Sequence, residues 1–122
     1  MKKPVFVSAQ DAAAMIGDGK TVATIGMTLV SASETILKAI EKRFLETGSP
    51  NQLTLVHSCG QSDRDRGIQH FSHDGMLKCI IGGHWGLQPR MMKMIAENKM
   101  LAYCLPQGQF AQLYRSMAGG EP

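Results

Sequence analysis

Glycine and hydrogen-bonding side chains occur together at four points along the chain, each directly after a short apolar run. The four segments are Gly26-Met27-Thr28, His57-Ser58-Cys59-Gly60, Gly82-Gly83-His84-Trp85 and Pro106-Gln107-Gly108. If the apolar runs are parallel strands, the segments meet at the carboxyl edge of a sheet, where such folds bind ligands. Glycine allows a tight turn or a close approach of the backbone to a ligand, although strand-to-helix turns also use glycine for structural reasons. We interpret the four segments together as a ligand site.

The histidines offer two further kinds of chemistry. His70 and His73 have the spacing of two metal ligands on one helix face, but the sequence specifies no third ligand, so we predict no metal site. His84, which follows a double glycine and precedes Trp85, is better placed to contact a ligand. The alternative for His84 is an imidazole that satisfies the backbone of its own turn.

The sequence contains no pattern typical of a nucleophilic catalytic site or of a nucleotide-binding motif. No Ser-His-Asp or Cys-His arrangement is evident, so we predict no catalytic residue in this chain. The sequence contains no GxxxxGK[ST] phosphate loop, and Gly17-Asp18-Gly19 precedes a strand, whereas the dinucleotide fingerprint follows one. The alternating charges of residues 63–66 are interpreted as a solvated ladder of ion pairs.

Composition indicates one domain over residues 1–122 in a reducing compartment. The chain is 43% hydrophobic and 19% charged, which is enough for one small core. Cys59, Cys79 and Cys104 are odd in number and lack CxxC spacing, which argues against disulfides or zinc; Cys79 and Cys104 are expected to be buried thiols. The net charge of +3 is spread along the chain, so we expect no nucleic-acid partner. Neither a signal peptide nor a membrane span is expected, and we predict a cytoplasmic protein.

Alternating apolar runs and helical patterns predict an α/β fold with an open, mostly parallel sheet and helices on both of its faces. Strands are expected over residues 21–25, 53–56, 78–81 and 100–105, and helices over 8–17, 33–47, 89–98 and 109–117. A polar loop without periodicity covers residues 58–67. On the second helix, Lys38, Glu41, Lys42 and Arg43 are expected to face water.

Several stretches together resemble the opening domain of acetate and propionate CoA-transferases, which belong to family I of the coenzyme A transferases. They are residues 41–48 (EKRFLETG), Arg64-Asp65-Arg66-Gly67, Gly83-His84-Trp85, Glu97-Asn98-Lys99-Met100 and Pro106-Gln107-Gly108. The resemblance covers essentially the whole chain, and Gly-His-Trp followed by Pro-Gln-Gly is its most specific part. It implies a Rossmann-like first domain, here incomplete, of an enzyme that moves coenzyme A between short-chain carboxylic acids.

The resemblance also implies where the chemistry of such an enzyme lies. A glutamate in a Gly/Ser-rich motif of the second half forms a glutamyl-CoA thioester, and this sequence has no such motif. We therefore expect an N-terminal half-site fragment that is inactive alone and needs the remaining CoA-transferase domain or subunit. We expect it to take acyl-CoA as substrate, to use no metal and to form a homo-oligomer.

The candidate substrate-binding residues are Gly26, Met27, Gly83, His84, Gln107 and Gly108. Gln107 matches the family glutamine that faces the substrate carboxylate or the catalytic glutamate, and Gly26 matches the glycine that begins the first substrate loop. After Gly26 the family has an aromatic, a small residue and a proline where this chain has Met27, Leu29 and Ser33. Leu29 is expected to narrow or fill the pocket. Two alternatives stay open: a noncatalytic α/β module that binds a small ligand or a partner, and a free-standing metal or thiol enzyme.

Overall fold

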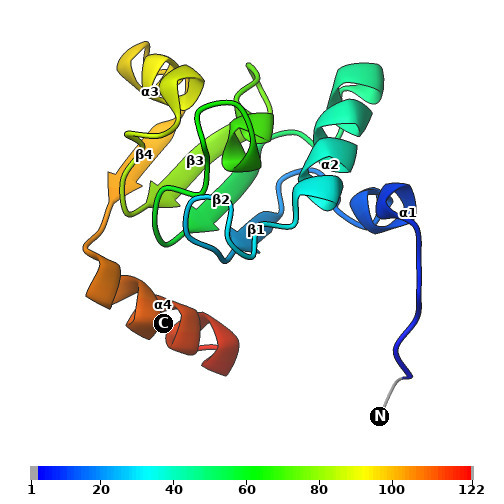
Figure 1. Ribbon diagram of the computed structural model, residues 1–122, viewed down its shortest axis with the longest axis horizontal. Coiled ribbons are helices and arrows are strands. Elements are labelled where there is room, and N and C mark those ends of the chain that lie inside the picture. The colour runs from blue at the N-terminus through cyan, green and yellow to red at the C-terminus, as the bar shows by residue number, and fades with distance from the viewer. Residues whose placement is uncertain (1–2, 122) are drawn as a thin grey trace.

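The computed structural model describes residues 3–121, which form an α/β domain on a four-stranded parallel sheet (Figure 1). In chain order the elements are α1 (Ala9–Ala14), β1 (Thr21–Thr24), α2 (Glu34–Thr47), β2 (Leu53–His57), η1 (Gly67–Phe71), β3 (Leu77–Gly82), α3 (Pro89–Ala96), β4 (Leu101–Cys104) and α4 (Gln107–Gly119). The strand order is β1-β2-β3-β4, so each strand pairs with the next one in the chain. The predicted open parallel sheet is therefore confirmed.

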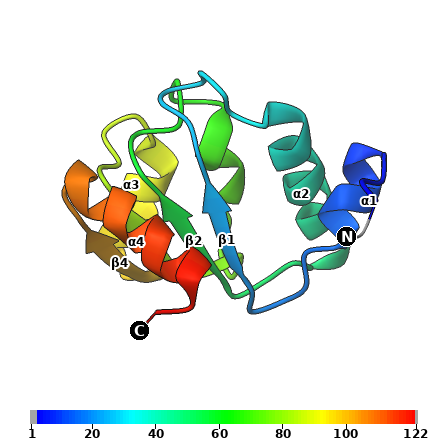
Figure 2. The same ribbon diagram turned by 90° about the horizontal axis from the view of Figure 1, so that it is seen from below.

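Parallel pairing requires a long crossover between successive strands, and each crossover here contains a helix. The crossovers run through α2, through η1 and through α3. In the sheet, Val22 of β1 pairs with Leu55 of β2, and Leu55 pairs with Ile80 of β3. Leu55 and Ile80 are fully buried. Because all four strands run the same way, their carboxyl ends and the loops that follow them lie at one edge of the sheet (Figure 2).

Helices cover both faces of the sheet, as predicted. In Figures 1 and 2, α2, η1 and α3 lie over one face and α4 lies under the other. The core between the sheet and the first group contains Ile40, Phe71 and Met91, and α1 packs on α2 at its outer side. Phe110 of α4 is fully buried, and the Tyr114 hydroxyl donates to the carbonyl oxygen of Thr24 at 3.3 Å.

The ends of the elements differ from the sequence-based ranges in two informative places. Helix α4 begins at Gln107 rather than 109, because Pro106 takes the N-cap position and leaves no turn residues before the helix. The predicted loop after β2 ends in the 3-10 helix η1, whose irregular period gives no signal in the sequence. The start of α1 is as expected, since the Ser8 side chain accepts from the Asp11 backbone N–H.

Two expectations about burial are wrong. Cys104 is exposed, because it lies in β4, which is at the edge of the sheet and has mostly exposed residues. Cys79, in β3, is only half-buried, and all three cysteines are free thiols. On α2, Arg43 does not face water, because its guanidinium donates to the carbonyl oxygens of Ala13 and Ile16 at the end of α1.

No helix of residues 3–121 combines the length and the apolar character that a membrane span requires.

Candidate functional site

A cavity of about 330 Å³ lies at the carboxyl edge of the sheet, where the loops after the strands meet. Its lining residues are Met27, Ser58, Cys59, Gly83, His84 and Gln107. Four of the six predicted substrate-binding residues thus meet at one place, although they are up to 80 positions apart in the chain (27 to 107). Gly26 and Gly108 precede or follow a lining residue without lining the cavity, and Leu29, expected to narrow it, is not among the lining residues either.

A buried histidine joins the turns after β2 and β3. His57 is fully buried; its Nδ1 lies 2.9 Å from the carbonyl oxygen of Cys59, and its Nε2 accepts from the indole N–H of Trp85 at 3.2 Å. These partners require a neutral ring with the proton on Nδ1. Burial lowers the pKa of His57 to about 4, which keeps the ring neutral. His57 therefore fixes the positions of two turns that line the cavity.

Glycine is required where these two turns touch. A Cβ at Gly83 would lie 1.9 Å from the carbonyl oxygen of Ser58, and one at Gly82 would lie 2.3 Å from Nε2 of His57. The Gly60 N–H donates to Nε2 of His84 at 3.1 Å, which adds a second link between the turns. The double glycine thus serves close backbone packing at the cavity wall.

The loop after β1 forms the third wall. The Thr28 N–H donates to the carbonyl oxygen of Gly60 at 3.0 Å, and the Cys59 thiol donates to that of Gly26 at 3.1 Å. Met27 and Val30 pair with each other in a tight turn. Thr28 and Ser31 have positive φ angles of 52° and 63°, a conformation that is costly for residues with a Cβ. This loop is held against the cavity in a strained conformation.

Gln107 brings α4 to the cavity. It is the first residue of the helix and is exposed, while Pro106 is the N-cap residue. Gln107 is therefore inside the helix and does not cap it. Its amide and the Ser58 hydroxyl give the cavity neutral hydrogen-bonding groups, and none of the lining residues is an acid, a lysine or an arginine.

The histidines with metal-ligand spacing form a different network. His70 lies between two carboxylates, 2.8 Å from Glu34 through Nε2 and 2.5 Å from Glu41 through Nδ1, and His73 Nε2 lies 2.6 Å from Glu41. Within residues 3–121, no group of three or more His, Cys, Asp or Glu side chains is arranged to hold a metal ion. Glu41, expected to face water, instead ties α2 to η1.

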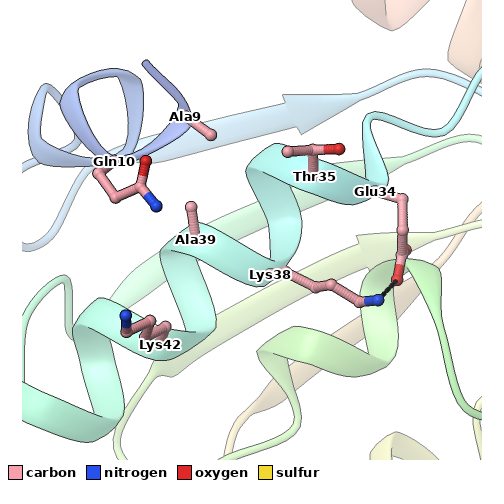
Figure 3. Close-up of a pocket in the computed structure, with 7 residues that line it drawn as sticks. All are labelled: Ala9, Gln10, Glu34, Thr35, Lys38, Ala39 and Lys42. Atoms are coloured by element: carbon pink, nitrogen blue, oxygen red, sulfur yellow. Dashed lines mark ion pairs between the residues drawn. The ribbon is translucent and has the colours of Figure 1, made fainter.

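Two other hollows offer less chemistry. One, of about 280 Å³, lies between α1 and α2 and is lined by Gln10, Lys38 and Lys42 among others; Lys38 pairs with Glu34 at 3.6 Å (Figure 3). The other, of about 360 Å³, lies beside β1 and is lined largely by apolar side chains, including Val22, Ile36 and Ile40. Neither hollow is lined by residues from more than two of the loops that follow the strands.

The sequence placed the segments of Ser58, Cys59 and Trp85 in the ligand site, but these three residues were not among the candidate substrate-binding residues. Their place directly after β2 and β3 is the signal that could have selected them. The structural role of His57 could not be predicted, because the sequence does not show which groups the ring of a histidine at a strand end will contact.

The fold and the site define the class of this chain as an open parallel α/β domain with a cavity at the carboxyl edge of its sheet. No family model matches the chain. The acetate CoA-transferase YdiF of Escherichia coli (strain K12) is 33% identical over 118 residues, which are 95% of this chain and 22% of that protein. The caffeate CoA-transferase of Acetobacterium woodii is 36% identical over 118 residues, 96% of this chain and 22% of that protein.

Solved structures agree with these relatives. The acyl-CoA transferase YdiF of Escherichia coli O157:H7, as a thioester complex with CoA, superposes with a TM-score of 0.87 at 33% identity, over 95% of this chain and 24% of that one. The apoenzyme of the same protein superposes with a TM-score of 0.89 at 32% identity, over 100% of this chain and 25% of that one. The chain is homologous to the CoA-transferases and has the fold of their N-terminal domain, and it spans about 22% of the length of the curated relatives it matches.

Proposed function

We propose that this chain is the N-terminal half-site of a CoA-transferase that moves coenzyme A between short-chain carboxylic acids of the acetate and propionate type. The observation that carries the proposal is the cavity. Met27, Gly83, His84 and Gln107, selected from the sequence, line it together. They do so in a chain that is 33% identical to an acetate CoA-transferase.

The cavity suits an acyl group. An acyl thioester has no net charge, so it can enter a site without charged walls at little electrostatic cost. The Gln107 amide can donate to a carbonyl or carboxylate oxygen without bringing a charge, and Met27 offers an adaptable apolar contact to a short alkyl chain. Acyl-CoA would be the substrate, and these residues would bind and orient it.

The covalent step would come from another part of the enzyme. Transfer through an enzyme thioester needs an activated nucleophile. Among the cavity residues, the Cys59 thiol is engaged with the carbonyl oxygen of Gly26. We propose that the remaining CoA-transferase domain or subunit supplies a glutamate, that the chain alone is inactive, and that the complete enzyme is a cytoplasmic homo-oligomer without a metal, nucleic-acid or membrane partner.

A chimera tests the proposal. In it, this chain replaces the homologous segment of Escherichia coli YdiF, and transfer of CoA from acetyl-CoA to propionate is measured. We expect transfer by the chimera, and none by this chain alone or by YdiF lacking the segment. Turnover by this chain alone would overturn the half-site assignment. A folded, assembled chimera that neither binds acyl-CoA nor turns over would overturn the function and favour a noncatalytic module.

A further inference from the structure

His84 lines the cavity, and both of its ring nitrogens face a backbone N–H. The Gly60 nitrogen lies 3.1 Å from Nε2, and the Gly86 nitrogen lies 3.3 Å from Nδ1. A neutral imidazole has one nitrogen that accepts and one that donates. One of the two backbone amides therefore faces a second donor rather than an acceptor.

Burial decides which nitrogen of His84 accepts. Gly60 is buried, and its backbone packs directly on the ring, since a Cβ there would lie 2.4 Å from Cε1 of His84. A buried N–H without an acceptor is costly, whereas water can satisfy an exposed one, and Gly86 is exposed. The distance from Nε2 to the Gly60 nitrogen, 3.1 Å, is also shorter than the distance from Nδ1 to the Gly86 nitrogen, 3.3 Å, which favours the same assignment. Nε2 thus accepts from Gly60, and the ring proton lies on Nδ1.

This tautomer leaves two donors side by side. The Nδ1 nitrogen of His84 and the backbone nitrogen of Gly86 are 3.3 Å apart, and both residues are exposed. Two adjacent N–H groups repel each other unless one oxygen accepts from both, which is how oxyanion sites hold a carboxylate or carbonyl oxygen. No acidic side chain lines the cavity to provide that oxygen.

We propose that the Nδ1–H of His84 and the N–H of Gly86 together bind one oxygen of the carboxylate of the acid that exchanges CoA. The inference rests on the proposed function and adds the anchor point of the free acid. The alkyl group of the acid would then extend toward Met27, which lines the same cavity. His84 acts here as a neutral donor and transfers no proton.

The tautomer is tested first, on the unmodified chain. Two-dimensional NMR of the nitrogen-labelled protein at neutral pH should show a protonated Nδ1 and an unprotonated Nε2 for His84. A protonated Nε2 would overturn the inference, because the ring would then have no donor beside Gly86. This measurement needs no variant and so does not depend on the folding of one.

Binding is tested with sodium propionate against sodium chloride at equal ionic strength. We expect propionate to shift the Gly86 amide and the His84 Nδ1 signals, and inorganic phosphate to shift them less. His84→Gln offers an oxygen to Gly60 but lacks the Nδ1 donor, and should weaken propionate binding about tenfold. His73→Gln, a histidine outside the cavity, is the matched control and should bind as the unmodified chain does.

Three results of the binding measurements would also overturn the inference. They are propionate shifts that spare Gly86, stronger shifts with phosphate than with propionate, and unchanged propionate affinity in a folded His84→Gln variant. A titration with CoA separates this from the proposed function. If CoA shifts the signals of Ser58 or Gln107 while propionate leaves Gly86 unmoved, the carboxylate anchor alone is wrong. If neither probe shifts any cavity residue, both proposals are wrong.

Discussion

Gln107 and Gln109 both lie in the first turn of α4 and are exposed, but of the two Gln107 lines the cavity. In the YdiF chimera, Gln107→Ala should lower kcat/KM about tenfold or more, because a hydrogen bond to a charged group is worth about 1.5–3 kcal/mol. Gln109→Ala is the matched control and should leave kcat/KM within about twofold. Equal effects of the two substitutions, or a fall in Tm without a change in kcat/KM, would contradict the assignment of Gln107 to the site.

Thr28 carries the clearest strain in the cavity wall. Its φ of 52° is costly for a β-branched residue, and glycine adopts such an angle freely. Thr28→Gly should therefore raise the free energy of unfolding, by about 0.5–1 kcal/mol after the greater freedom of glycine in the unfolded chain is counted. Thr35→Gly, in the first turn of α2 where the backbone is helical, should lower the free energy of unfolding by a similar amount. Denaturant unfolding measures both, and a loss of stability in Thr28→Gly would show that the side chain contributes more than its strain costs.

Among the elements, α2 and η1 are joined by charge rather than by apolar contact alone. Burial would raise the pKa values of Glu34 and Glu41, but hydrogen bonds from His70 and, for Glu41, from His73 outweigh it and lower both values below 4.5. A carboxyl whose pKa is lower in the folded state stabilises the fold above its unfolded pKa, and loses this effect as the pH falls through the folded value. The junction is thus expected to weaken in acid.

Glu41→Gln tests this junction. At neutral pH it should lower the free energy of unfolding by about 1–2 kcal/mol, because two histidines lose a charged acceptor. The loss of stability between about pH 6 and pH 3 should also be shallower than in the unmodified chain. Glu46→Gln removes an exposed partner of Lys42 and should change little. Parallel pH curves for the unmodified chain and Glu41→Gln would contradict the role given to the network.

The elements with a clear period could be predicted from the sequence, and those fixed by contacts could not. The apolar runs of β2 and β3 and the apolar positions of α2 predicted these elements to within one or two residues. Glycine after strands located the cavity, and four of its lining residues were named. The partners of His57, Glu41 and Arg43 depend on how separate segments pack, which no local pattern in the sequence contains. The exposure of Cys104 likewise follows from the place of β4 at the sheet edge.

At the scale of the whole molecule, apolar side chains are left uncovered at both edges of the sheet. Ile25, just after β1, is 72% exposed, and Leu101 and Tyr103 of β4 are 62% and 54% exposed. Edge strands with apolar surface pair with other chains. The isolated chain should therefore associate as its concentration rises, which analytical ultracentrifugation measures.

Tyr103→Lys should increase the monomer fraction, because a charged edge resists pairing. Lys93→Arg, an exposed and charge-conserving change on α3, is the control and should leave association unchanged. A monomer at all concentrations, with a cooperative melt at or above about 60 °C, would contradict both the association and the limited stability expected of so small a domain.

The hydrogen bond between Trp85 and His57 has a practical consequence, because Trp85 is the single tryptophan of the chain. Its emission is an intrinsic optical probe at the junction of two cavity walls, and no label is needed to follow what happens there. Since the His57 pKa is about 4, acidification toward that value should add a proton to Nε2, remove the acceptor of the indole N–H and change the emission. At neutral pH the same signal would report on occupation of the cavity beside His84.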